Sequence, residues 1–188
     1  MLYNYCGKEK YVVIPDGVTD ISIRAFMGCE TLETVILPET LIKIWKFAFS
    51  RCVNLEKIEI PESVTYIGTG AFAECASMTY IVIPSNVNYI GYSAFADCSN
   101  LVSLTFNATE CIDFNMVEMV GMIDYPFVNC PISEVIFGET VEKIPAYFLS
   151  DASVENLTYF TIPSSVESIG QHAFDSCYYL QNVECKGT

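Results

Sequence analysis

Residues 55–77 read LEKIEIPESVTYIGTGAFAECAS, and this pattern returns along the chain at a fixed spacing of 23 residues. Each of the first four units ends in Ala-Phe-x-x-Cys, whose phenylalanines are Phe26, Phe49, Phe72 and Phe95. Prolines keep the same spacing, at Pro15, Pro38, Pro61 and Pro84. A period of about 20–50 residues indicates a solenoid in which each unit forms one turn. Such a chain has a repetitive surface, which favours a binding surface over an active site.

One unit can be interpreted residue by residue. The β-branched and aromatic residues 80–83 predict a short strand that ends at Pro84, because proline cannot donate to a strand ladder. Apolar residues alternate with mixed ones in every such strand, so one strand face is expected in the core and the other in solvent. Ser93-Ala94-Phe95 is expected to begin a short helical or 3₁₀ turn.

Composition excludes several classes of protein. Of the 188 residues, 52% are apolar, which is incompatible with disorder. A net charge of −14 argues against nucleic acid or anionic lipid as a partner, since both attract basic surfaces. Residues 1–15 lack the apolar centre of a signal peptide, and no apolar run approaches the roughly 20 residues of a membrane span.

The units resemble the BspA-type leucine-rich repeats, with their I-P and A-F-x-x-C signatures, over essentially the whole chain. The resemblance implies an α/β leucine-rich-repeat solenoid, with a parallel sheet on the concave face and short helical or 3₁₀ turns on the convex side. We expect residues 1–188 to form a single domain of about eight turns. Both ends fall in mid-repeat, which suggests a segment of a longer array or ends that pair with something.

Two units depart from the pattern. The Phe-x-x-Cys motif at Phe127 arrives nine residues late, so residues 107–126 are expected to include a loop that leaves the solenoid. In the following unit, Phe148 is aligned with the phenylalanine position and Val154 with the cysteine position.

Seven of the nine cysteines share one position of the repeat: Cys6, Cys29, Cys52, Cys75, Cys98, Cys130 and Cys177. A column of buried thiols is favoured over disulfides or a metal site, because no paired C-x-x-C spacing occurs. His172, the only histidine, is interpreted as a surface residue rather than as the partner of Cys177 in a catalytic pair. We therefore predict no catalytic, cofactor-binding or metal-binding residues, and no enzyme.

The outward face of the strands is the candidate site. Tyrosines share one outward position beside aliphatic residues, and aromatic side chains are enriched in protein interfaces. The candidate partner-binding residues are Tyr11, Val13, Ile36, Lys57, Glu59, Tyr80, Val82, Glu134, Ile136 and Tyr159. Glu59, Glu134 and Glu184 could face a basic partner, as could Glu110, Asp113, Glu118 and Asp124. The alternative is a solvated acidic surface.

The resemblance implies a protein-recognition or adhesion module at a microbial cell surface, secreted or surface-attached, that binds a host or matrix protein. The alternative is a structural spacer within a longer repeat protein. The expected partner is a protein, and the unfinished ends also allow end-to-end self-association.

Overall fold

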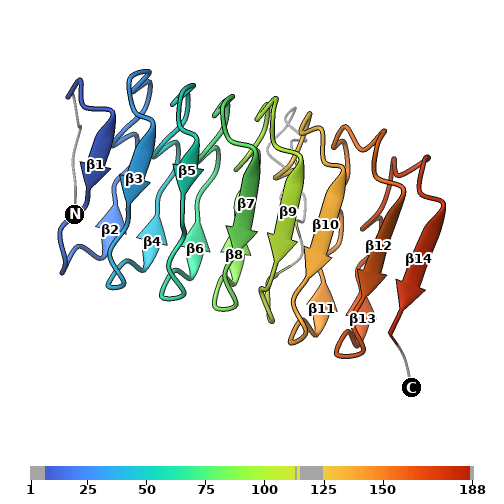
Figure 1. Cartoon of the computed structure of the whole chain (residues 1–188). Helices are drawn as coiled ribbons and strands as arrows, with labels where there is room; N and C mark the ends of the chain where they lie inside the picture. Colours follow the sequence, from blue (N-terminus) through green and yellow to red (C-terminus); the bar gives the residue numbers. More distant parts are fainter. Residues whose placement is uncertain (1–6, 113, 115–124, 187–188) are drawn as a thin grey trace, which may run out of the picture.

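The computed structural model describes residues 7–112, 114 and 125–186 (Figure 1). One face carries the strands β1 (Tyr11–Val13), β3 (Thr34–Ile36), β5 (Lys57–Ile58), β7 (Tyr80–Ile83), β9 (Ser103–Phe106), β10 (Glu134–Phe137), β12 (Tyr159–Ile162) and β14 (Asn182–Cys185). The opposite face carries β2 (Asp20–Ile21), β4 (Lys43–Ile44), β6 (Tyr66–Ile67), β8 (Tyr89–Ile90), β11 (Lys143–Ile144) and β13 (Ser168–Ile169). We name these the long-strand face and the short-strand face.

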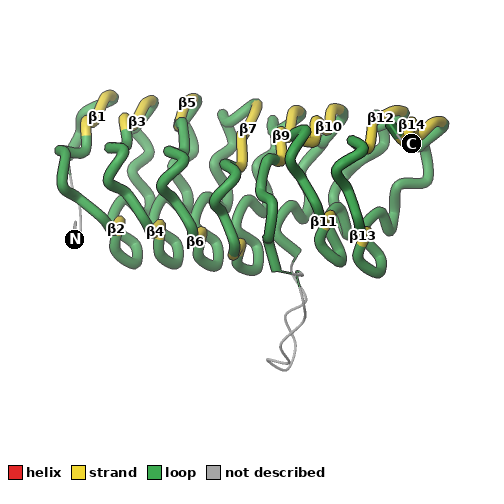
Figure 2. Tube along the Cα trace, turned by 90° about the horizontal axis from the view of Figure 1, so that it is seen from below, coloured by secondary structure: helices red, strands yellow, loops and turns green. Residues whose placement is uncertain are grey.

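The strands stack in parallel with the register that the period demands. Tyr11 lies opposite Thr34, and Thr34 opposite Lys57, which is one period per step. About seven turns of a parallel solenoid result, and they stand in a nearly straight row (Figure 2). The predicted inward positions are buried through the middle of the stack, as Ile81 and Leu104 show, and Val183 in β14 is exposed.

The expected helical or 3₁₀ turns are wrong: no helix occurs in the described residues (Figure 2). The reason lies in alternating backbone hydrogen bonds between Phe47 and Cys52. The N–H groups of Phe47, Phe49 and Arg51 donate to the next turn, at Thr69, Ala71 and Ala73. The N–H groups between them donate three residues back within their own turn. An α-helix needs every N–H for its own ladder, so this segment cannot form one.

Two left-handed residues shape most of these segments. In the second unit they are Phe47, with φ of 58°, and Arg51, with φ of 62°. The equivalent residues of the fourth unit, Ser93 and Asp97, have φ of 52° and 59°. This conformation is unfavourable for residues with a Cβ. It recurs because it turns alternate N–H groups toward the next turn.

Phenylalanine rings form the centre of the stack. Phe49 and Phe72 lie 5.4 Å apart and nearly parallel, and Phe72 and Phe95 lie 5.2 Å apart in the same way. All three side chains are fully buried. Aromatic burial of this kind gives both a large apolar area and a favourable ring contact.

Residues 107–112, the start of the predicted excursion, remain in the stack. Asn107 donates its N–H to the carbonyl of Ile83, and Ile112 donates to that of Asn88. Ala108 and Cys111 are buried. Residues 113 and 115–124, with Asp113, Glu118 and Asp124, lie outside the described residues. The regular pattern has resumed at Pro126, whose carbonyl accepts from the N–H of Phe95.

The alignment of the next unit needs a correction of one residue. Leu149 donates its N–H to the carbonyl of Ala173, as Phe72 does to that of Ala94. Ala152 then donates to Leu149, as Cys75 does to Phe72. Leu149 and Ala152 therefore occupy the phenylalanine and cysteine positions, in place of Phe148 and Val154.

The ladder of the long-strand face is interrupted at two places. Its paired groups are β1-β3-β5, then β7-β9-β10, then β12-β14. The short-strand face is continuous from β2 to β8, and β11 pairs with β13.

Replacing one ring of the phenylalanine stack should destabilise the fold strongly. Phe72→Ala leaves a cavity between two neighbouring rings, and we expect a loss of about 3–5 kcal/mol in the free energy of unfolding. Phe72→Leu should cost less than half as much, because leucine occupies this position at Leu149. Urea unfolding followed by circular dichroism measures both. Equal losses for the two variants would show that aromatic packing is not what holds this position.

Candidate functional site

All ten predicted partner-binding residues are exposed on the long-strand face. The most exposed aromatic and aliphatic residues among them are Tyr11 at 59% and Val13 at 57%, and Ile136 and Tyr159 each reach 48%. Soluble proteins usually place polar residues at such outward strand positions. This face therefore carries an apolar character that packing in the core does not explain.

The residues fall into three groups that follow the three ladders of the long-strand face. In the first, Val13 lies directly opposite Ile36. In the second, Val82 and Ile136 lie on either side of Thr105, in one row across β7, β9 and β10. The predicted tyrosine column is not one contiguous patch, because β3 and β5 separate Tyr11 from Tyr80.

The second and third groups contain ordered polar contacts. Tyr80 and Glu134 both lie beside Ser103, whose hydroxyl donates to the Glu134 carboxylate at 2.6 Å. The Tyr159 hydroxyl donates to the Glu184 carboxylate at 2.7 Å and lies 2.6 Å from Thr161 Oγ1. These contacts hold the Glu134 and Tyr159 side chains in defined positions, so less conformational entropy is lost when a partner binds.

A cleft of about 280 Å³ opens at the second interruption of the long-strand face. It is lined by residues of β10 and β12, which are neighbours on the long-strand face (strands labelled in Figure 1). Its lining includes residues 134–137 of β10 and 159–161 of β12, with Glu139 and Lys186. Residue-by-residue reasoning did not find this cleft. The sequence offers one signal for it, a longer connection before β12. Tyr159 follows Leu149 by ten residues, whereas Tyr80 follows the equivalent Phe72 by eight.

The short-strand face carries an aromatic ladder that the sequence reasoning also missed. The rings of Trp45 and Tyr66 are 5.3 Å apart, and those of Tyr66 and Tyr89 are 4.7 Å apart and nearly parallel. Trp45 Nε1 donates to Asp20 at 2.9 Å. Burial raises the pKa of the Tyr66 and Tyr89 hydroxyls. Because their rings face one another, these residues act as packing between turns.

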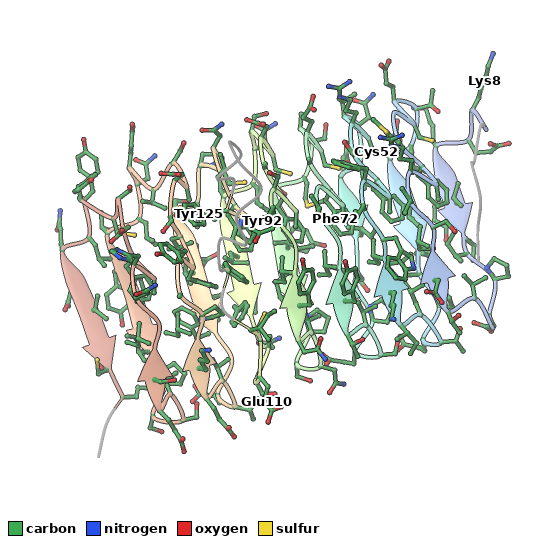
Figure 3. All side chains as sticks on the ribbon, turned by 180° about the vertical axis from the view of Figure 1, so that it is seen from behind. Lys8, Cys52, Phe72, Tyr92, Glu110 and Tyr125 are labelled. Carbon is green, nitrogen blue, oxygen red and sulfur yellow. The ribbon has the colours of Figure 1, made fainter. Side chains whose placement is uncertain are left out.

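His172 belongs to a surface stack. Its ring lies 5.0 Å from that of Tyr147, which lies 5.1 Å from that of Tyr125 (Tyr125 is labelled in Figure 3). Its Nδ1 lies 2.7 Å from the carboxylate of Asp175. Burial raises the pKa of the Cys177 thiol to about 11, so Cys177 is protonated at neutral pH. A protonated thiol is a poor nucleophile, which does not favour a Cys–His catalytic pair.

The cysteine column has a structural role in hydrogen bonding. The thiol of Cys52 (labelled in Figure 3) donates to the carbonyl of Phe26 in the preceding turn at 3.1 Å, and Cys75 donates to the carbonyl of Phe49 at 3.2 Å. Cys98 and Cys130 make the same contact at 3.2 and 3.0 Å. No disulfide joins the eight cysteines among the described residues, and Cys6 lies outside them. Cys29 and Cys177 are only half-buried, because each lies near one end of the stack.

In the described part of the chain, no group of histidine, cysteine and carboxylate side chains is arranged to hold a metal ion. Within the same residues, no helix has the length and hydrophobicity to cross a membrane.

Comparison with known proteins agrees with this architecture. The sequence profile of the BspA type leucine rich repeat region matches residues 1–116 and 121–188, in six copies. No curated protein matches the chain. Among solved structures, a leucine rich repeat protein of T. pallidum is 27% identical, with a TM-score of 0.70, over 95% of this chain and 81% of that protein.

Two more distant structures also match the chain. The pneumococcal vaccine antigen PcpA is 17% identical with a TM-score of 0.55, and the match covers 96% of this chain and 42% of the PcpA chain. A leucine rich cell surface protein of Faecalibacterium prausnitzii is 23% identical with a TM-score of 0.43, over 95% of this chain and 60% of its own. The chain therefore spans about half of the length of these two proteins.

The buried thiols should make the protein sensitive to alkaline pH. Burial and the neighbouring Cys29 raise the pKa of Cys52 from 9.0 to about 12. Between these values the thiol ionises in the unfolded chain and not in the folded one. The contribution of Cys52 to the free energy of unfolding is therefore fully present below pH 9. It is lost as the pH rises toward 12.

Thermal unfolding from pH 8 to 11 should show this fall, and Cys52→Ala should reduce the slope. Ellman titration at pH 8 should label few thiols in the native state and many more after denaturation. Several intramolecular disulfides in non-reducing mass spectrometry would contradict the thiol column.

Proposed function

This chain belongs to the BspA-type leucine-rich repeat family, and we propose that it is a protein-recognition module that binds through the long-strand face. Leucine-rich repeats are generally protein-interaction modules, and their solenoid is typically a scaffold without catalytic activity. The supporting observation is the exposed apolar row formed by Val82 and Ile136, with Tyr80 beside it. Tyrosine side chains such as that of Tyr80 are among the usual anchors of protein interfaces.

The proposal extends to adhesion. In keeping with the family resemblance, the partner is a host or extracellular matrix protein, and the site of action is the microbial cell surface. Because the chain carries a net charge of −14, the partner is a protein whose contact surface is basic or neutral.

A double substitution tests the face. Tyr80→Ala with Val82→Ser removes an anchor and its aliphatic neighbour, and we expect binding to weaken at least about 30-fold, at about 1.4 kcal/mol per decade. Immobilised protein would first capture partners from host extracellular proteins. Biolayer interferometry with the identified partner would then give the dissociation constants.

Tyr178→Ala is the matched control, because Tyr178 is 86% exposed and lies outside the long-strand face. Neither change should lower the free energy of unfolding by more than about 0.5 kcal/mol, since both alter outward side chains. A partner that binds the double variant as tightly as the original protein would rule out this face. If partner capture fails for every variant, the spacer role becomes the better account.

We also propose end-to-end association of the solenoid. The outer edge of β14 makes no ladder in the described chain, and Ile169 and Val183 are 48% and 37% exposed at positions buried in the central turns. A parallel strand from a second copy would cover them, which gives a head-to-tail contact. Sedimentation velocity should then show concentration-dependent species larger than 21.0 kDa, and Ile169→Lys should abolish them. A single monomeric species at all concentrations would refute this contact.

A further inference from the structure

We propose that the cleft between β10 and β12 binds an arginine side chain from an extended segment of the protein partner. This inference rests on the proposed function, because it places the specificity of the long-strand face at one position. Three features of the described residues carry it: unpaired strand edges, an acidic rim and an oriented aromatic ring.

The strand edges follow from the parallel ladder. β10 pairs with β9 on one side, and β12 pairs with β14 on the other. Glu134 and Gly138 donate their N–H groups to Val102 and Phe106, so the backbone groups of these alternate residues point toward β9. In a parallel strand the residues between them point the opposite way. The N–H and C=O groups of Val135 and Phe137 therefore face the cleft.

The same argument applies across the cleft. Asn182 donates its N–H to the carbonyl of Thr158, and Lys186 donates to that of Ile162, so these alternate residues of the β12 segment face β14. Tyr159 and Thr161 consequently direct their backbone groups toward β10. No ladder joins the two strands among the described residues. The carbonyl groups along both edges are thus available to a donor from outside the chain.

The rim of the cleft is acidic. Glu134 and Glu139 line it, and Glu184 lies beside Thr161 on the neighbouring strand. The only cation among the lining residues is Lys186, whose Nζ lies 3.0 Å from Glu139. Three carboxylates and one ammonium leave a local charge of −2. Lys186, which follows β14, thus places one ammonium group on this rim, next to a carboxylate.

Arginine fits this combination better than other side chains. Its planar guanidinium carries five N–H donors in a fork, which suits a site that offers carbonyl oxygens and carboxylates together. The Tyr159 ring, held by its hydroxyl contact with Glu184, lies at the rim and offers a surface for the guanidinium or its stem. A volume of about 280 Å³ suits one long side chain and is smaller than most small-molecule sites.

A titration with a single blocked arginine tests the site without knowledge of the partner. N-acetyl-arginine methylamide is added to the ¹⁵N-labelled full chain, and amide shifts are followed by two-dimensional NMR. We expect saturable shifts at Val135, Phe137, Tyr159 and Thr161. The matched citrulline derivative, which is uncharged and nearly isosteric, should bind at least about tenfold more weakly.

Matched variants separate the cleft from the general negative charge. Glu134→Gln with Glu139→Gln should weaken arginine binding at least about tenfold. Glu30→Gln with Glu167→Gln removes the same charge from exposed positions outside the cleft and should change the affinity less than twofold. Non-saturable shifts spread over the acidic surface, or equal effects of the two variants, would overturn the proposal.

The two proposals can fail separately. A partner whose binding requires Tyr80 and Val82 and is unaffected by the Glu134 and Glu139 changes would support the face and refute the cleft. Saturable arginine binding that depends on both glutamates, in a protein whose natural partner ignores Tyr80 and Val82, would support the cleft and refute the wider face.

Discussion

The fold depends on the backbone hydrogen bonds that join one turn to the next in the Ala-Phe-x-x-Cys segment. Alternate N–H groups there donate outward to the following turn, and the groups between them donate within the turn. This arrangement fixes the left-handed residues at Phe47 and Arg51. It also aligns the phenylalanine rings, because residues with equivalent bonds lie directly above one another. The thiols add a third connection, from Cys52, Cys75, Cys98 and Cys130 to the preceding turn.

The period of the sequence was sufficient to predict the stack, its strand register and its inward columns. It could not predict the conformation between strands. By local propensity, Ser93-Ala94-Phe95 could form a helix. The alternating hydrogen-bond pattern is favourable only because the neighbouring turn supplies carbonyl groups that accept from alternate N–H groups. The one-residue error at Phe148 has a related cause. Both Phe148 and Leu149 are apolar and buried, so only the hydrogen bond from Leu149 to Ala173 identifies the position.

The candidate site was predictable in part for a similar reason. Outward positions follow from the strand alternation, so the exposure of Tyr80, Val82 and Ile136 could be derived from the sequence. The cleft could not, because it results from how two strands lie relative to one another. A longer connection before Tyr159 accompanies it, and β5 and β7 are also unpaired although their connection has the usual length. Spacing alone therefore does not identify an interruption of the sheet.

Such interruptions give a repeat protein a means of specificity. In a continuous ladder every backbone group of an inner strand is satisfied, and a partner can distinguish turns only by their outward side chains. Where β10 and β12 separate, backbone carbonyls join Glu134 and Tyr159 at the surface, so this turn differs chemically from its neighbours. The rigid turns on either side keep these groups in fixed positions. A partner that needs both carbonyls and carboxylates is thereby directed to an interruption rather than to the repetitive parts of the face.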